Sequence, residues 1–102
     1  MTIEGKFTIS EEHKCLAGHF PDYPVVPAVV IIDNIVSIIQ TKDKTARLVK
    51  IKHMKFMKPL FPNVECKVII EMKDSQQVKV NCYNHEGIIA QGQFELHCEA
   101  ME

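Results

Sequence analysis

Apolar and polar residues follow two different periods along the chain, and these periods predict one helix and several strands. Residues 27–40 are rich in Val and Ile but do not alternate. Pro27 suits the first turn of a helix. We therefore expect a buried central helix over 27–40, apolar on most of its circumference. Its polar residues share one stripe at helical spacing, namely Asp33, Asn34, Ser37 and Gln40.

The rest of the chain alternates between apolar and polar positions, as strands with one buried face do. The apolar parity changes near His53, which predicts a β-bulge inside one strand. The expected strands span 5–9, 46–58, 65–72, 77–83 and 88–99.

The last expected strand shows the two faces of the predicted sheet most clearly. One face carries Ile88, Ala90, Phe94, Leu96 and Cys98. The other carries Gln91, Gln93, Glu95 and His97. One helix packed on one such antiparallel sheet gives an α+β layer. Without an internal repeat or linker, we expect a single domain over 1–102.

Composition limits the class of protein. The chain has 102 residues, 46% of them hydrophobic and 25% charged, and a net charge of −1. These values are typical of a globular domain that is small enough to benefit from a partner subunit. The net charge gives no attraction to nucleic acid or anionic lipid, and the spaced aromatics of a nucleic-acid platform are missing.

The expected compartment is the cytoplasm. Residues 1–10 carry Glu4 and lack the apolar core of a signal peptide, and the longest apolar run, 28–32, is too short to cross a membrane. The cysteines form no C-x-x-C pair, so we expect small buried hydrophobes instead of disulfides. These cysteines are Cys15, Cys66, Cys82 and Cys98.

The candidate chemistry begins in residues 18–27, G-H-F-P-D-Y-P-V-V-P. Three prolines within seven residues restrict the backbone near His19. Asp33 follows fourteen positions later, inside apolar sequence. An imidazole and a carboxyl of this kind suit proton transfer.

Residues 18–33, GHFPDYPVVPAVVIID, resemble the active-site segment of the hot-dog-fold 3-hydroxyacyl-[acyl carrier protein] dehydratases, with the same spacing from histidine to acid. Residues 51–62, IKHMKFMKPLFP, are similar to a later strand of that family, which ends in a P-x-x-P step. The resemblance implies a hot-dog fold, in which an antiparallel sheet wraps around one central helix. It also implies dehydration of 3-hydroxyacyl thioesters to trans-2-enoyl thioesters, in fatty acid or related polyene or polyketide synthesis.

On this resemblance His19 is the base that takes the C2 proton, and Asp33 helps the C3 hydroxyl to leave. Free N–H groups at the start of the helix, around Ala28 and Val29, suit the thioester oxygen. The substrate-binding residues are expected to be Phe20, Pro27, Ala28, Val29 and Phe56. No cofactor is expected beyond the phosphopantetheine that carries the substrate, and no metal.

The same family builds its site between two subunits, so we expect a homodimer in which His19 faces Asp33 of the other copy. The implied partner is an acyl carrier protein, which is acidic. A basic segment suits such a partner, or is an ordinary solvated strand face. It consists of Lys42, Lys44, Arg47, Lys50, Lys52, Lys55 and Lys58.

Two positions depart from the family pattern. Asp22 and Ala28 both stand where glycine is usual, so one adds a charge near His19 and the other a methyl group at the helix start. Two alternatives therefore stay open. One is a hot-dog thioesterase, and the other is a non-catalytic subunit that binds acyl chains or carrier protein.

Overall fold

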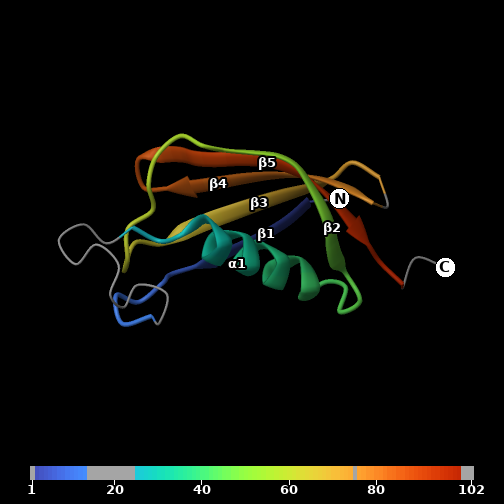
Figure 1. Cartoon of the computed structure of the whole chain (residues 1–102), viewed down its shortest axis with the longest axis horizontal. Coiled ribbons are helices and arrows are strands. Elements are labelled where there is room, and N and C mark those ends of the chain that lie inside the picture. Colours follow the sequence, from blue (N-terminus) through green and yellow to red (C-terminus); the bar gives the residue numbers. More distant parts are fainter. Residues whose placement is uncertain (1, 14–24, 75, 100–102) are drawn as a thin grey trace.

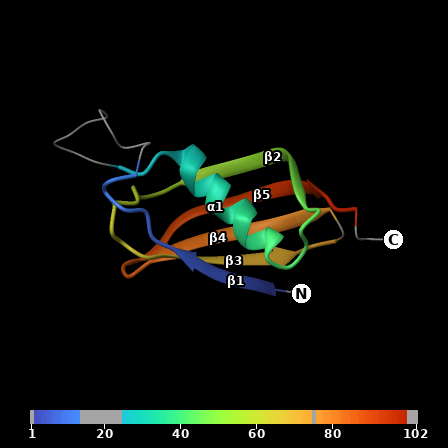
Figure 2. The same ribbon diagram turned by 90° about the horizontal axis from the view of Figure 1, so that it is seen from below.

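A single antiparallel sheet covers one long side of α1 in the computed structural model, which describes residues 2–13, 25–74 and 76–99 (Figure 1). The strand order is β1-β3-β4-β5-β2, and all four neighbouring pairs are antiparallel. Seen from the side of the helix, α1 crosses the strands at a slant (Figure 2). The elements are β1 (Thr2–Phe7), α1 (Ala28–Gln40), β2 (Arg47–Phe56), β3 (Cys66–Met72), β4 (Gln77–Asn84) and β5 (Gly87–His97).

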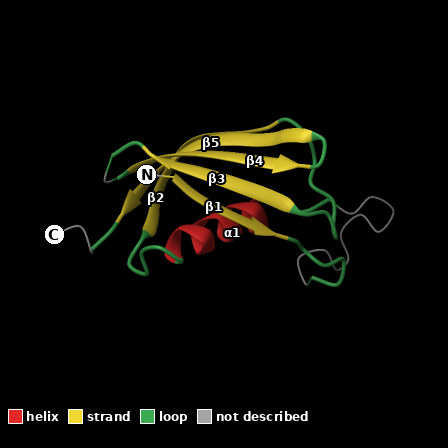
Figure 3. Cartoon of the chain, turned by 180° about the vertical axis from the view of Figure 1, so that it is seen from behind, coloured by secondary structure: helices red, strands yellow, loops and turns green. Residues whose placement is uncertain are grey.

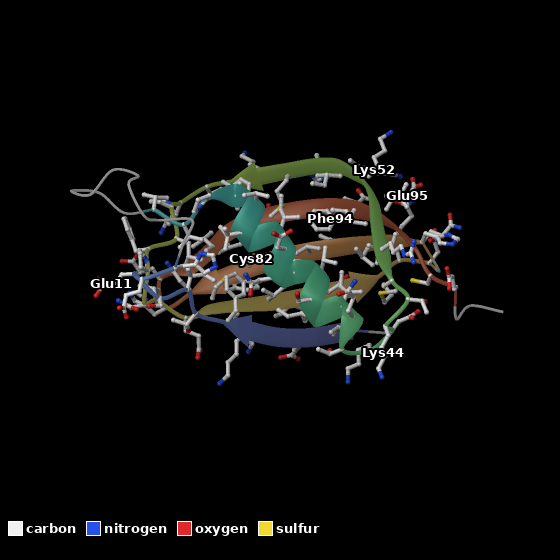
Figure 4. The ribbon with its side chains drawn as sticks, turned by 60° about the horizontal axis from the view of Figure 1, so that its bottom comes forward. Glu11, Lys44, Lys52, Cys82, Phe94 and Glu95 are labelled. Atoms are coloured by element: carbon white, nitrogen blue, oxygen red, sulfur yellow. The ribbon has the colours of Figure 1, made fainter. Side chains whose placement is uncertain are left out.

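The core lies between α1 and the inner face of the sheet. The helix contributes Val30, Ile31, Ile35 and Ile39, which are all buried. The sheet contributes alternate residues such as Val68, Val80 and Phe94, each with no exposed surface. In Figure 4, Cys82 lies behind α1 and Phe94 lies beside it, and both are fully buried.

The predicted α+β hot-dog arrangement, with its helix and four of its strands, is confirmed to within a few residues at each end. The first strand spans Thr2–Phe7 instead of 5–9, although Ile9 is still buried beyond its end. The helix differs in burial. Val29, Asp33 and Ser37 are exposed in the isolated chain, so α1 is buried along one face and not around most of its circumference.

The predicted bulge near His53 is confirmed, and a second one accompanies it. The register between β2 and β5 shifts between Leu48 and Lys50 and again between Ile51 and His53. Bulges bend a strand, and β2 turns sharply along its length around the end of the helix (Figure 3). These two bends curve the sheet around α1.

Gly92 on β5 allows β2 to approach at the second bulge. A Cβ at this position would collide with Met54 Sδ and lie 2.9 Å from the backbone oxygen of His53. The position also faces Phe94, so the neighbourhood has no spare volume. A side chain here would therefore push β2 away from the sheet.

A polar cluster fixes the connection from α1 to β2. Asp43 accepts hydrogen bonds from the Thr45 hydroxyl (2.6 Å) and backbone N–H (2.9 Å), which lower the pKa of its carboxyl. The Glu99 N–H donates to the Thr45 hydroxyl (2.9 Å), and the Gln40 amide donates to the Ala46 carbonyl (2.9 Å). The end of β5 is thereby tied to the end of the helix.

The described cysteines are free thiols, as the sequence predicts; Cys15 lies outside the described residues. Cys66 and Cys82 come from neighbouring strands and have no exposed surface. Contact with Cys66, together with burial, raises the pKa of the Cys82 thiol. Cys82 is therefore a neutral core side chain.

The two edges of the sheet differ in charge compensation. At the β1 edge, Lys6 pairs with Glu65 and Lys67 pairs with Glu4, each at 3.7 Å between nitrogen and oxygen. These are exposed pairs of small energetic value, but they neutralise the edge locally. Within residues 2–13, 25–74 and 76–99, no ion pair involves a cation of β2.

Substitution of Gly92 by Ala is expected to lower the free energy of unfolding by about 1–3 kcal/mol, because the backbone of β2 must move. Gly5→Ala is the comparison variant, because the nearest atoms that its Cβ would meet all belong to the side chain of Ile38 and none to the backbone of a neighbouring strand. Urea unfolding of both variants measures the difference. Equal losses would contradict the role assigned to Gly92.

Candidate functional site

An apolar cavity of about 340 Å³ opens at the start of α1. Its walls come from the segment before the helix, the first turns of the helix and the end of β2 with the segment that follows. This volume lies within the range of small-molecule sites. The lining residues are Val25, Val26, Pro27, Ala28, Ile31, Phe56, Met57, Lys58, Pro59 and Leu60.

Backbone hydrogen bonds hold the two walls of this cavity together. The Val26 N–H donates to the Leu60 carbonyl at 2.8 Å, which joins the segment before the helix to the segment after β2. The N–H groups of Met57 and Lys58 both donate to the Ile89 carbonyl, at 2.8 and 3.2 Å. The cavity is therefore a fixed feature of the fold.

The start of α1 presents backbone donors at the cavity. Pro27 is the N-cap and supplies no side-chain hydrogen bond, and the first turn contains no acidic residue. The Pro27 carbonyl accepts from Val30 and Ile31, at 3.1 and 3.3 Å. The N–H groups of Ala28 and Val29 come earlier in the helix, where backbone donors have no acceptor within the helix. The helix dipole also favours a negatively charged group at this end.

The structure brings three of the predicted substrate-binding residues together. Pro27, Ala28 and Phe56 all line the cavity, although Phe56 is far from the other two in sequence. Val29 does not line it and is 63% exposed on the outer side of α1. His19 and Phe20 lie outside the described residues, so the predicted distance from His19 to Asp33 stays a prediction.

Asp33 lies on the exposed face of α1. It follows Val29 by one helical turn and precedes Ser37 by another, so these residues form one exposed stripe. No cation among the described residues forms an ion pair with the Asp33 carboxylate. The side-chain amide of the neighbouring Asn34 donates a hydrogen bond to the Val30 carbonyl (2.9 Å), so this amide is bonded within its own helix. Asp33 therefore points away from the cavity of its own chain.

Sequence reasoning missed most of the second cavity wall. Met57, Lys58, Pro59 and Leu60 follow Phe56 directly and line the cavity with it. The P-x-x-P step at Pro59 was the available signal, because prolines end the strand and turn the chain across the helix start. Leu60 is 1% exposed and belongs to both wall and core.

The basic segment does not form one patch at the cavity. Lys58 follows β2 and lines the cavity, and Lys55 lies near the C-terminal end of β2. Lys44 and Lys52 lie toward the other end of the molecule from the start of α1 (Figure 4). Only the C-terminal part of the basic segment can therefore act at the cavity mouth.

The described ranges contain neither a cluster of metal-ligating side chains nor a helix that could cross a membrane. No group of three His, Cys, Asp or Glu residues there is arranged to hold a metal ion. No helix found in those ranges has the length and apolar character needed to span a bilayer.

Comparison with known proteins decides the family. Residues 1–93 match the model of the ApeI-like dehydratases, described as ApeI dehydratase. The chain belongs to the ApeI-like dehydratase family. A 3-hydroxyacyl-[acyl-carrier-protein] dehydratase FabZ of Geotalea uraniireducens (strain Rf4) is 30% identical in a 64-residue alignment that covers 53% of this chain and 44% of that protein. The chain thus spans under half the length of that relative.

Solved structures share the hot-dog fold of this ApeI-like chain. One is the dehydratase heterocomplex ApeI:P from Xenorhabdus doucetiae, with a TM-score of 0.82 and 22% identity over 96% of this chain and 88% of that one. Another is a hypothetical Thermus thermophilus protein of the thioesterase superfamily, with a TM-score of 0.65 and 14% identity over 94% and 79%. Such identities support the fold alone, and the fold hosts more than one activity.

The cavity wall can be tested through stability. Leu60→Ala is expected to lower the free energy of unfolding by about 2–5 kcal/mol, because it empties a fully buried position. Met57→Ala should cost clearly less, since Met57 is 36% exposed on the same segment. Denaturant unfolding measures both. A larger loss for Met57→Ala would mean that the wall is packed differently.

Proposed function

We propose that this ApeI-like protein dehydrates 3-hydroxyacyl thioesters carried on an acyl carrier protein. The observation that carries the proposal is the apolar cavity at an uncapped helix start, lined by residues of both segments that resemble the dehydratases. An acyl chain fits apolar walls, while the thioester oxygen suits the backbone donors of Ala28 and Val29. A fatty acid or related polyene or polyketide pathway is the expected setting.

The proposed reaction is a reversible elimination. The C2–H bond breaks and its proton passes to His19, and the C2 electron pair forms the double bond to C3. The C3–O bond breaks at the same time, and Asp33 delivers the proton with which the hydroxyl leaves as water. The backbone donors of the helix start stabilise the charge that develops on the thioester oxygen. The products are the trans-2-enoyl thioester and one water.

The exposed position of Asp33 supports a site made by two subunits. Its carboxylate lies on the α1 face that points away from its own cavity, beside the 63% exposed Val29. A charged group on an open face can act only on something that covers this face. If a second subunit packs against α1, Asp33 of the first subunit lies at the cavity of the second. His19 of the second subunit then completes that site.

His19→Ala is expected to lower turnover by about 10²–10⁴-fold, because the C2 proton loses its base. Asp33→Asn should also lower turnover, whereas Ser37→Ala, on the same exposed face, should not. The assay follows ultraviolet absorbance of the enoyl product at protein concentrations where sedimentation detects the paired form. Full activity of His19→Ala would refute the assigned base, and release of free thiol would identify a thioesterase instead.

Lys58 is expected to guide the carrier protein, because among the described residues it is the one charged side chain that lines the cavity. Lys58→Gln should raise KM for carrier-bound substrate by about two- to fivefold and leave kcat unchanged, as for an exposed ion pair worth up to about 1 kcal/mol. Lys44→Gln, away from the cavity, is the control. Steady-state kinetics at two salt concentrations measure the effect, and equal KM changes in both variants would contradict it.

A further inference from the structure

We propose that the outer face of the sheet binds a phosphate-type oxyanion, either a free ion or the phosphate group of a small phosphomonoester. The site is a polar hollow of about 210 Å³, called the outer hollow below. Because α1 covers the other face of the sheet, the outer hollow is separate from the apolar cavity at the helix start (Figure 1). The lining residues are His53, Lys73, Lys79, Gln91, Gly92 and Gln93.

The β-bulge in the middle of β2 places His53 on this outer face. Ile51 lies opposite Phe94, which is fully buried on the inner face, and simple alternation would put His53 on the inner face too. The extra residue, Lys52, shifts the alternation by one, so His53 lies opposite Gln93 instead. Bulges often re-aim a side chain in this way next to a functional site. The change of parity in the sequence therefore has a consequence on the polar side of the sheet.

Strand register brings hydrogen-bond donors from neighbouring strands together at the outer hollow. Gln93 of β5 is paired with His53 of β2 on one side and with Lys79 of β4 on the other. Lys73 directly follows β3, and Gln91 lies two residues before Gln93 on the same face. Ammonium, imidazole and amide groups can all donate hydrogen bonds. Such a set suits an oxyanion, because its oxygens are acceptors and its charge strengthens each bond.

The two ammonium groups of the outer hollow are not neutralised by ion pairs. No carboxylate among the described residues lines the hollow. Glu71 lies opposite Lys79 in the register, but neither Lys79 nor Lys73 forms an ion pair with the described residues. Glu95, farther along β5, accepts a hydrogen bond from the Gln77 side chain at 3.5 Å. Positive charge therefore remains available to a ligand.

A hydrogen bond beside the outer hollow occupies a carbonyl oxygen that would repel an anion. The Gln91 side-chain amide donates to Asn81 Oδ1 at 3.2 Å, and Asn81 is only 7% exposed. This bond also restricts the Gln91 side chain to one orientation. The side-chain amide of Gln93 has no hydrogen-bond partner within the described parts of the chain, so it can turn its N–H groups toward a ligand.

The size and the lining of the outer hollow favour a small anion over an acyl chain. Sites for drug-sized molecules have volumes of about 300–1,000 Å³. The apolar cavity of about 340 Å³ falls in this range, whereas the outer hollow of about 210 Å³ is smaller. The described lining has no aliphatic side chain and no Phe, Tyr or Trp. A single phosphate group is small enough for this space and accepts hydrogen bonds on several sides.

The experiment measures binding of inorganic phosphate and of methyl phosphate to the full chain by nuclear magnetic resonance. Sodium chloride keeps the ionic strength constant, so that general screening does not change during the titration. K73Q/K79Q removes both ammonium groups from the outer hollow. Q93E keeps the shape of the Gln93 side chain but places a carboxylate among the donors. Circular dichroism melting checks that each variant folds.

K6Q/K67Q is the matched control, because it removes the same amount of charge at the β1 edge of the sheet. Lys6 and Lys67 do not line the outer hollow, and they already pair with Glu65 and Glu4. A general attraction of phosphate to a positive surface would respond equally to both double variants. A site at the outer hollow responds only to the loss of its own lysines.

Inorganic phosphate should cause saturable shifts in the amide signals of Lys79, Gln91 and Gln93. K73Q/K79Q should weaken binding by at least about fivefold, as for two exposed charge contacts. Q93E should weaken it at least as much, and K6Q/K67Q should leave it within about twofold of the wild type. Methyl phosphate that binds as tightly as inorganic phosphate would assign the site to phosphomonoesters. Clearly weaker binding of methyl phosphate would assign it to the free ion.

Two results would overturn the proposed anion site. One is a set of phosphate-induced shifts that do not saturate, or that are as large at the β1 edge as at the outer hollow. The other is equal weakening of phosphate binding by the two double lysine variants. Either result would reduce the outer hollow to an ordinary solvated part of the sheet surface.

Discussion

The packing of one apolar helix face into a curved antiparallel sheet is the constraint on which the rest of the structure depends. Ile31, Ile35 and Ile39 of α1 are almost completely buried against the inner face of the strands. A flat sheet would leave the sides of the helix uncovered, so the sheet has to curve. The bulges of β2 provide this curvature, and Gly92 allows β2 to lie close enough to the sheet.

The candidate site follows from the same packing. Because β2 bends around the helix, the segment after Phe56 crosses the start of α1 and is held there by the bond from Val26 to Leu60. Apolar walls and the orphan donors of a helix start then meet at one place. The chemistry proposed for this family is thus located where the fold already brings an apolar surface and backbone dipoles together.

Much of this arrangement could be predicted from the sequence, because it depends on local patterns. The stripe of polar residues identified α1, and the change of parity at His53 identified the bulge. The burial of α1 on one face alone could not be predicted, since an exposed Val29 looks like a core residue in sequence. Leu60 and its neighbours were missed because their contact with Val26 is long-range and leaves no periodic signal. His19 lies outside the described residues, so its geometry remains a prediction.

The unequal edges of the sheet have a consequence for growth of the assembly. On β1, the pairs Lys6–Glu65 and Lys67–Glu4 compensate charge within the chain, whereas no cation of β2 forms an ion pair with the described residues. A sheet that offered the same adhesive edge on both sides would add strand after strand and form a fibre. In this sheet the two edges differ, because one has its charges paired within the described residues and the other does not. The two edges therefore do not attract the same neighbour, which works against such repeated addition.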